Sequence, residues 1–165
     1  SLEAAAKLAR ENGIPAVVLS DTIEGEARDI GMMHAAIARE VCLRDQPFIK
    51  PVVLLSGGET TVTIGASTGG KGGRNSEFLM ACAGGIEGHK ILALAADTDG
   101  IDGSEDNAGA FADGSTWARI RGAGLDPLAV LGAHDAWGAF DSIGDIFAPG
   151  PTGTNVNDFS AILIR

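Results

Sequence analysis

The chain has 165 residues, which is long enough for one domain with a sizeable core. A net charge of −10, with no cluster of Lys and Arg, argues against nucleic acid and anionic membranes as binding partners. No stretch approaches the ~20 apolar residues of a membrane-spanning helix, and we expect a cytoplasmic protein.

The first fifty residues predict a helix, a strand and a second helix. An amphipathic pattern over residues 2–12 is followed by Gly13, and glycine is common at the end of a helix. Residues 16–19 form an apolar run typical of a buried parallel strand. Apolar residues then recur every three or four positions, which predicts a helix over residues 24–43. His34 lies beside this stripe, and we expect a partly buried structural histidine, because no second His or Cys stands at metal-ligand spacing.

The segment from residue 51 to residue 77 carries the strongest indication of a binding site. Two short runs rich in apolar and β-branched residues, 51–55 and 60–64, predict a pair of strands. Four glycines fall among the next eight residues, and an apolar helical pattern follows. We therefore expect a glycine-rich loop that leads into a helix over residues 74–83.

Such a loop suits an anion. Backbone N–H groups that no side chain covers, placed before a helix N-terminus, attract phosphate or carboxylate, and Lys71 and Arg74 add positive charge. The spacing almost fits a P-loop, but Gly72 stands where Ser or Thr would ligate Mg²⁺. The alternative is a flexible connection with solvated Lys and Arg side chains, and spacing alone favours neither interpretation.

A further strand is predicted over residues 90–96, which are almost continuously apolar. The alternation of strands and helices indicates an α/β fold, a layered α/β sandwich with a mixed, largely parallel sheet. Five carboxylates fall within residues 97–106, just past this strand, where open α/β sheets place their ligands. They could hold Mg²⁺ together with substrate phosphates, or they could form an acidic turn whose Asp side chains cap their own backbone.

The last third of the chain predicts two short helices and a final strand. Ser115 and Asp126 are expected to cap helices over residues 116–121 and 128–132. A third polar loop, rich in Gly, Thr and Asn, precedes a strand over residues 159–164. The three loops together could hold a phosphate, a divalent metal and a polyol. Neither a Ser-His-Asp set nor a G-x-G-x-x-G dinucleotide fingerprint accompanies them.

Two pairs of residues could be taken for a metal site or a catalytic pair, but their positions in the predicted helices argue against both. Cys42 and Cys82 fall on apolar helical faces, so we expect buried thiols in a reducing cytosol and no zinc site. His134 and Asp135 are neighbours, but adjacent side chains on a helix point apart, so a catalytic pair is not expected.

Five motifs occur in one order along the chain. They are Ser56-Gly57-Gly58-Glu59-Thr60-Thr61-Val62-Thr63, Gly72-Gly73-Arg74-Asn75, Thr98-Asp99-Gly100-Ile101-Asp102-Gly103, Ala108-Gly109-Ala110 and Gly150-Pro151-Thr152-Gly153-Thr154-Asn155-Val156-Asn157-Asp158. This series resembles the MOFRL domain, the C-terminal domain of bacterial-type glycerate 2-kinases, a family often labelled hydroxypyruvate reductase. The resemblance covers about residues 52–165, and residues 1–50 resemble the tail of the family's preceding Rossmann-like domain. We therefore expect one α/β domain over residues 1–165, cut from a longer two-domain enzyme.

The resemblance implies ATP- and Mg²⁺-dependent transfer of a phosphoryl group to D-glycerate, giving 2-phosphoglycerate, in a cleft between the two domains. Arg74, Asp99 and Asp102 would be catalytic, with Arg74 binding the substrate carboxylate or the transferring phosphoryl group. Glu59, Asp99 and Asp102 would ligate Mg²⁺. The substrate or its phosphate would be bound by Gly57, Gly58, Lys71, Gly72, Gly73, Asn75, Thr152, Thr154, Asn155 and Asn157.

Three points limit this expectation. The family's catalytic lysine belongs to the N-terminal domain, so this chain alone is expected to be nearly inactive, and a homodimer could form through the interface left exposed. Ser76 stands where Gln is usual, and His134-Asp135-Ala136-Trp137 replaces a common Asn-Asp-Ser-Tyr, which puts a polar role of that helix in doubt. An NAD(P)H-dependent hydroxypyruvate reductase and a non-catalytic ligand-binding module stay open as alternatives.

Overall fold

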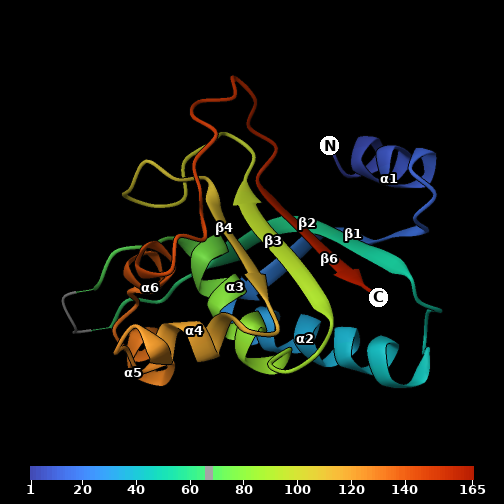
Figure 1. Cartoon of the computed structure of the whole chain (residues 1–165). Coiled ribbons are helices and arrows are strands. Elements are labelled where there is room, and N and C mark those ends of the chain that lie inside the picture. The colour runs from blue at the N-terminus through green and yellow to red at the C-terminus, as the bar shows by residue number, and fades with distance from the viewer. Residues whose placement is uncertain (66–68) are drawn as a thin grey trace.

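The chain forms one six-stranded sheet with helices packed against it (Figure 1). The computed structural model describes residues 1–65 and 69–165, so three residues of the predicted glycine-rich loop lie outside the described residues. In chain order the elements are α1 (Leu2–Glu11), β1 (Ala16–Glu26), α2 (Ala27–Arg44), β2 (Val52–Thr61), α3 (Arg74–Gly85), β3 (Ile91–Asp97), β4 (Gly109–Asp113), α4 (Thr116–Gly122), α5 (Pro127–Gly132), α6 (Ala136–Ser142), β5 (Ile146–Phe147) and β6 (Asp158–Ile164).

The strand order is β1-β2-β6-β3-β4-β5, which confirms the α/β class and the mixed sheet. The expectation that parallel pairs predominate was wrong. Among the described strands β1 and β2 pair in parallel, and the other four neighbouring pairs are antiparallel. The predicted β2-α3-β3 unit does bring two strands of the same direction into the sheet. However, β6 lies between them and runs antiparallel to both, so a late strand converts the expected parallel pair into two antiparallel ones.

The larger core lies on one face of the sheet, beneath α2 to α6. Strand residues such as Leu54 and Ile162 meet Leu79 of α3 and Phe140 of α6 there, all of them fully buried. The opposite face carries a smaller cluster, in which α1 covers only the β1–β2 end. Residues 1–50 therefore share their sheet and their core with the rest of the chain. Among the described residues, no helix is long and apolar enough to cross a membrane.

The predicted pair of strands at residues 51–55 and 60–64 is wrong, because a single strand, β2, runs from Val52 to Thr61, and residues 62–64 lie outside it. Gly57 and Gly58 look like a turn in the sequence but lie inside the ladder. Gly58 has a φ of 150°, and a Cβ atom on it would overlap the carbonyl oxygen of Ile23 on β1. Glycine is needed here for close strand packing rather than for a turn. Likewise β1 continues to Glu26, so the predicted helix begins three residues later than expected.

Several local predictions are confirmed. Asp126 caps α5 by accepting a hydrogen bond from the Leu128 N–H at 3.0 Å. His34 is buried and bonds to the Ile30 carbonyl at 2.8 Å and to the Ser56 hydroxyl at 2.9 Å, as expected of a structural histidine. Cys82 is buried, and burial raises the pKa of its thiol to about 12, so it is an unreactive core residue. The short strands β4 and β5 were not predicted.

Candidate functional site

The candidate site lies at the sheet edge where β2 and β3 end and β6 begins. Asp97, the last residue of β3, pairs in register with Asp158, the first residue of β6. Arg74 opens α3 directly above this pair, on the helix-covered side of the sheet. The edge therefore brings together an arginine and two aspartates from three segments far apart in the sequence.

Arg74 is held by three carboxylates. Its Nε donates to Asp158 Oδ1 at 2.6 Å and its Nη2 donates to Asp97 Oδ2 at 2.9 Å, while Nη1 lies 3.4 Å from Glu59 Oε1. The two aspartate side chains are about 10% exposed, at 9% and 11%, whereas Glu59 is 62% exposed. The aspartates thus fix the plane of the guanidinium. Nη1 is left facing the solvent side with a single weak partner.

Burial and charge act against each other at this cluster. Burial lowers the pKa of Arg74, but the charges and hydrogen bonds of Asp158 and Asp97 outweigh it, so the pKa of the guanidinium is raised above its ordinary value. Burial also raises the pKa of Asp97 above its ordinary value, against the hydrogen bond from the Asp99 N–H and the attraction of Arg74. Three carboxylates around one arginine leave the cluster with a formal net charge of about −2 when all are ionised.

Asp102 caps the N-terminus of α3. Its Oδ1 accepts from the Asn75 N–H at 2.9 Å and from Asn75 Nδ2 at 3.3 Å, and its Oδ2 accepts from the Ser76 N–H at 2.8 Å and Oγ at 2.6 Å. The side chain is buried, and burial raises the pKa of Asp102 above its ordinary value. Both oxygens of Asp102 therefore accept hydrogen bonds from α3, and its predicted role as a catalytic residue or a metal ligand stays a prediction.

The three predicted magnesium ligands do not form one group. Within residues 1–65 and 69–165, no set of three His, Cys, Asp or Glu side chains is arranged to hold a metal. Glu59 faces Arg74, and Asp102 faces α3. Asp99 Oδ1 accepts a hydrogen bond from the Ile101 N–H at 2.8 Å, which is the self-capping acidic turn considered from the sequence.

The described part of the glycine-rich loop is fastened to the connection between α5 and α6. The Gly70 N–H donates to the Ala133 carbonyl at 2.7 Å, and the Lys71 N–H donates to Asp135 Oδ1 at 3.0 Å. Two of the backbone donors expected to cradle an anion are thus already engaged. The Lys71 ammonium lies 5.0 Å from the centre of the Trp137 ring and 3.5 Å from Glu105 Oε2, and its side chain is exposed, so its charge is paired but can be reached from solvent near the site.

The predicted binding glycines have structural roles. The backbones of Gly57 and Gly58 are paired with β6, and a Cβ on Gly57 would lie 2.8 Å from the Asp158 carbonyl oxygen. A Cβ on Gly73 would overlap the Asp102 carboxylate, and Asn75 is buried against Asp102 and Asp158. These residues build the site rather than facing a ligand.

The third loop lies against the acidic loop, as Figure 1 shows above the sheet. Thr98 joins them, because its N–H and Oγ1 both donate to the Asn157 carbonyl, at 3.1 Å and 2.9 Å. Thr152 Oγ1 donates to the Thr98 carbonyl, and Asn155 Oδ1 accepts from the Asn157 N–H at 3.3 Å. The side chains of these loop residues and of Thr154 are exposed, so the predicted third loop does present polar groups near the acidic loop.

Sequence reasoning missed a second ionic cluster, which Glu77 of α3 forms with Arg28 and His134. Glu77 is almost fully buried and accepts from Arg28 Nη2 at 2.7 Å. His134 Nδ1 lies 3.0 Å from both Glu77 oxygens, so the partner of this histidine is Glu77 and not the adjacent Asp135. No local signal links residues this far apart in the chain, and only the fold brings them together.

A pocket of about 440 Å³ opens beside Arg74, between the end of β2 and the acidic loop. Its wall includes Thr60, Thr61, Asp97, Asp102 and Gly103. The size suits a small polar molecule.

A model of the MOFRL family matches residues 52–158, which is more than half of the chain.

The chain belongs to the MOFRL family. Two Agrobacterium vitis proteins named "Putative hydroxypyruvate reductase" are 52% and 51% identical to it over 165 residues. A Pyrococcus horikoshii protein named glycerate 2-kinase is 42% identical over 164 residues. These matches cover 99% of this MOFRL chain but 43%, 38% and 37% of the relatives, so the chain spans about two fifths of their length.

Solved structures of the family share the fold. A glycerate kinase from Thermotoga maritima matches with a TM-score of 0.94 at 39% identity, covering 99% of this chain and 39% of that one. A Pyrococcus horikoshii protein matches with a TM-score of 0.95 at 42% identity, covering 99% of this chain and 37% of that one. The MOFRL chain therefore keeps the fold of these longer proteins over its whole length.

Proposed function

We propose that the longer parent of this MOFRL chain is a glycerate 2-kinase, which transfers a phosphoryl group from ATP to D-glycerate and releases 2-phosphoglycerate and ADP. Relatives named glycerate 2-kinase from Pyrococcus horikoshii and Thermotoga maritima, 42% and 40% identical, support this proposal. A structure titled glycerate kinase, with a TM-score of 0.94, supports it further.

The observation that carries the proposal is the orientation of Arg74. Two largely buried aspartates hold the guanidinium, and Nη1 points toward the exposed Glu59 at 3.4 Å, beside the 440 Å³ pocket. A carboxylate or phosphoryl oxygen that enters the pocket displaces Glu59 and takes a charge-assisted hydrogen bond from Nη1. The aspartates hold the Arg74 side chain in place before the substrate binds, so little conformational entropy has to be lost when the transition state forms.

The residues present fit Mg²⁺ only as an ion held mainly by phosphates. Mg²⁺ in phosphoryl-transfer sites commonly takes one or two carboxylates and completes its shell with substrate oxygens and water. Glu59 is engaged through Oε1 and Asp99 through Oδ1, so the other carboxylate oxygen of each would hold the ion. When bound, the ion offsets negative charge on the nucleotide phosphates.

The exposed polar groups of the site would recognise the rest of the substrate. Lys71 keeps its ammonium toward solvent and would contact a nucleotide phosphate or the glycerate carboxylate as a point charge. The loop of Thr152, Thr154, Asn155 and Asn157 offers hydroxyl and amide groups that suit the hydroxyls of glycerate or of the nucleotide ribose.

Turnover would require the rest of the parent. We propose that the missing part includes a Rossmann-like domain that brings the catalytic lysine to this site and encloses the substrates, so that this chain alone is nearly inactive. The test compares the full-length parent and this chain, each with D-glycerate, ATP and Mg²⁺. Turnover by this chain at a rate comparable with that of the parent would refute the two-domain requirement.

The kinase proposal is tested on the full-length parent. ADP and 2-phosphoglycerate are expected with D-glycerate, ATP and Mg²⁺. Arg74→Met should lower kcat/KM by about a hundredfold, because it removes an interaction with the reacting anion. Arg121→Met is the matched control, since Arg121 is an exposed arginine on α4 that pairs with Glu87. Equal losses in the two variants would contradict a role for Arg74.

A reductase is the second candidate, because two relatives above 50% identity carry the hydroxypyruvate reductase name. Hydroxypyruvate and NADH are therefore offered to the same parent in a separate assay. Loss of NADH absorbance without any phosphorylation of D-glycerate would replace the kinase proposal with the reductase. The absence of both activities would favour a ligand-binding module.

A further inference from the structure

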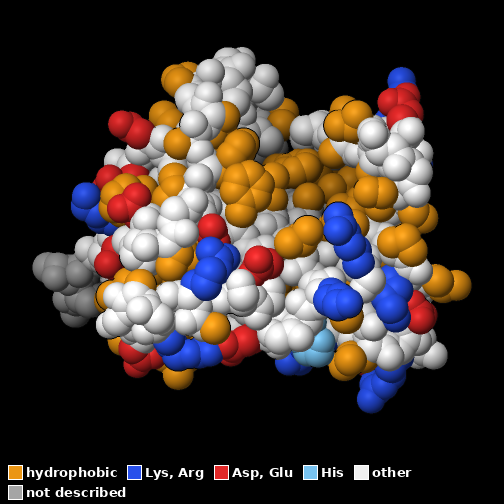
Figure 2. Space-filling model, viewed as in Figure 1, with side chains coloured by type: hydrophobic (Ala, Val, Ile, Leu, Met, Phe, Trp, Pro, Cys, Tyr) orange, Lys and Arg blue, Asp and Glu red, His pale blue; other side chains and the backbone are white. Residues whose placement is uncertain are grey.

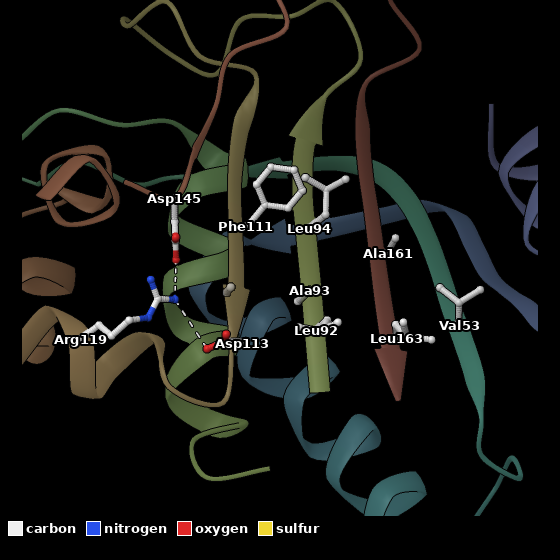
Figure 3. A pocket seen from close by; sticks show the side chains of 11 residues that line it. Val53, Leu92, Ala93, Leu94, Phe111, Asp113, Arg119, Asp145, Ala161 and Leu163 are labelled. Carbon is white, nitrogen blue, oxygen red and sulfur yellow. Dashed lines mark hydrogen bonds and ion pairs between the residues drawn. The ribbon is translucent and has the colours of Figure 1, made fainter. Parts of the chain in front are cut away.

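In the part of the chain that the structure describes, no helix covers one half of the sheet on the face opposite α2 and α3. Leu92 and Leu94 on β3, Phe111 on β4 and Leu163 on β6 point to this side (Figure 3). Leu92 is 45% exposed and Phe111 is 46% exposed. Figure 2 shows apolar side chains gathered over these strands, between the upper loops and α1. The outward face of β3, β4 and β6 is called the open face below.

The strand sequences have the composition of strands whose open face is buried. An antiparallel sheet with one face in water alternates apolar and polar residues, whereas a sheet covered on both faces is apolar at successive positions. Residues 91–96 of β3 are Ile, Leu, Ala, Leu, Ala and Ala, and residues 161–164 of β6 are Ala, Ile, Leu and Ile. Both strands therefore have the pattern of strands buried on two sides. Among the described residues, the outward side chains of β6 are partly buried against the cluster under α1, whereas Leu92 of β3 is 45% exposed.

The open face is also hollowed. A groove of about 370 Å³ runs along it, with Leu94, Phe111 and Leu163 in its wall. Its rim is ionic, because Arg119 Nη2 lies 2.6 Å from Asp145 Oδ2 and 3.6 Å from Asp113 Oδ1. These charges are paired within the chain, so covering the groove would leave no isolated charge in an apolar interface.

This chain already supplies part of a cover. Leu2 and Ala6 of α1 are buried against Val53 and Leu55, which face the same side of the sheet at its β1–β2 end. The cover stops there, and the β3–β4 end continues the same apolar surface without a partner among the described residues. A second packing layer is thus begun by this chain and left incomplete.

We propose that the open face is the surface on which the remainder of the parent protein packs. The related proteins are longer than this chain, which covers 37% to 43% of their lengths, so more than half of each is available to complete the layer. A covering segment in the same polypeptide needs no separate encounter, because its effective concentration is high. The proposal rests on the longer parent proposed above and not on the reaction that the parent catalyses.

Cysteine labelling of the full-length parent tests this surface. Phe111→Cys reports on the open face, and Leu128→Cys on the outer side of α5 is the control, because Leu128 is 67% exposed and outside both core clusters. Alkylation by iodoacetamide is followed for each peptide by mass spectrometry, which separates the new thiols from Cys42 and Cys82. We expect the Phe111→Cys thiol to react at least about tenfold more slowly than the Leu128→Cys thiol, since it must wait for local opening.

Three outcomes decide the proposal. Similar rates at the two positions would overturn it, since the open face would then be as accessible in the parent as it is here. Protection of Phe111→Cys that is lost on about hundredfold dilution would also overturn it, because the cover would then be a second copy. Protection that is independent of concentration supports it.

A second measurement avoids the substitution. Hydroxyl-radical oxidation of the unmodified parent should leave Phe111 protected while the exposed Leu128 reacts, and oxidation of Phe111 at the rate of the unfolded chain would overturn the proposal. Protection found in a parent without glycerate kinase activity would refute the proposed function and leave this surface standing, so the two failures are distinguishable.

Discussion

The arginine at the head of α3 should stabilise the fold as well as serve the site, and Arg74→Met separates these roles. The substitution keeps most of the stem but removes the charge. Asp97 and Asp158, each about nine-tenths buried, would then face each other without a counter-ion. Removing one member of a buried ion pair typically costs about 3–5 kcal/mol, and the 26% exposure of Arg74 places it near the lower end.

One effect opposes this loss. Arg74 is the first residue of α3, where a positive charge is unfavourable, so its removal should return at most about 1 kcal/mol. The loss of the counter-ion outweighs this gain, and we expect α3 and the strands around it to lose about 2–3 kcal/mol of local stability. That corresponds to about 30- to 100-fold faster hydrogen exchange of the α3 amides, since 1.4 kcal/mol is a factor of about ten.

The loss should depend on pH. Burial already raises the pKa of Asp97 in the presence of Arg74, and removing the arginine raises it further. The folded variant then binds a proton that the unfolded chain does not, so stability is present at low pH and is lost as pH rises through the folded pKa. The exchange ratio of variant to wild type should therefore fall as the pH is lowered through the raised pKa of Asp97.

Hydrogen exchange of the full-length parent, resolved for the α3 peptides by mass spectrometry, measures this ratio at each pH. Wild type and variant are compared at the same pH, so the intrinsic exchange rate cancels. A variant with unchanged α3 exchange would show that the ion pairs contribute nothing to folding. A large ratio that stays constant with pH would show that the loss comes from packing and not from the aspartates.

Three further predictions concern stability. Asp102→Ala leaves two buried α3 N–H groups without an acceptor, so it should cost about 3 kcal/mol and speed α3 exchange, and unchanged exchange would exclude the cap. Gly58→Ala must push β1 away at Ile23, so hydrogen exchange should become faster in the β1 and β2 peptides alone. Wild-type exchange rates in these peptides would contradict the close contact between Gly58 and Ile23. Glu77→Gln removes the buried charge that pairs with Arg28. It should lower the melting temperature of the parent by several degrees, at about 2–4 °C per kcal/mol. An unchanged melting temperature would show that the ion pair contributes nothing to folding.

The parts of the fold that could be predicted were those encoded by neighbouring residues. The helix over α2 follows from apolar residues three and four positions apart, and the start of α5 follows from Asp126 followed by Pro127. The strands β3 and β6 follow from short apolar runs. Each of these patterns depends on interactions between residues a few positions apart, so it can be recognised in the sequence without knowledge of the fold.

The parts that escaped prediction depend on which strands become neighbours. Asp97 and Asp158 are 61 positions apart by their numbering, and only the insertion of β6 beside β3 places them on one arginine. Asp102 was predicted as a ligand from its match to an acidic position of the MOFRL family, and nothing in the sequence indicated that its side chain is buried and caps α3. Two strands were predicted on either side of Gly58, because the sequence alone does not distinguish a break in a strand from a close contact between strands.

The position of β6 determines when the sheet can be completed during synthesis of the chain. The last strand to be synthesised in this chain lies in the middle of the sheet, between β2 and β3. While the ribosome is still making the preceding segments, those two strands have no common neighbour, and their edges stay open to other chains. Asp158 arrives with the same strand, so Arg74 gains its closest partner only at that moment. Closure of the sheet and completion of the site should therefore be a single late event, and a nascent chain that stalls before residue 158 would carry neither.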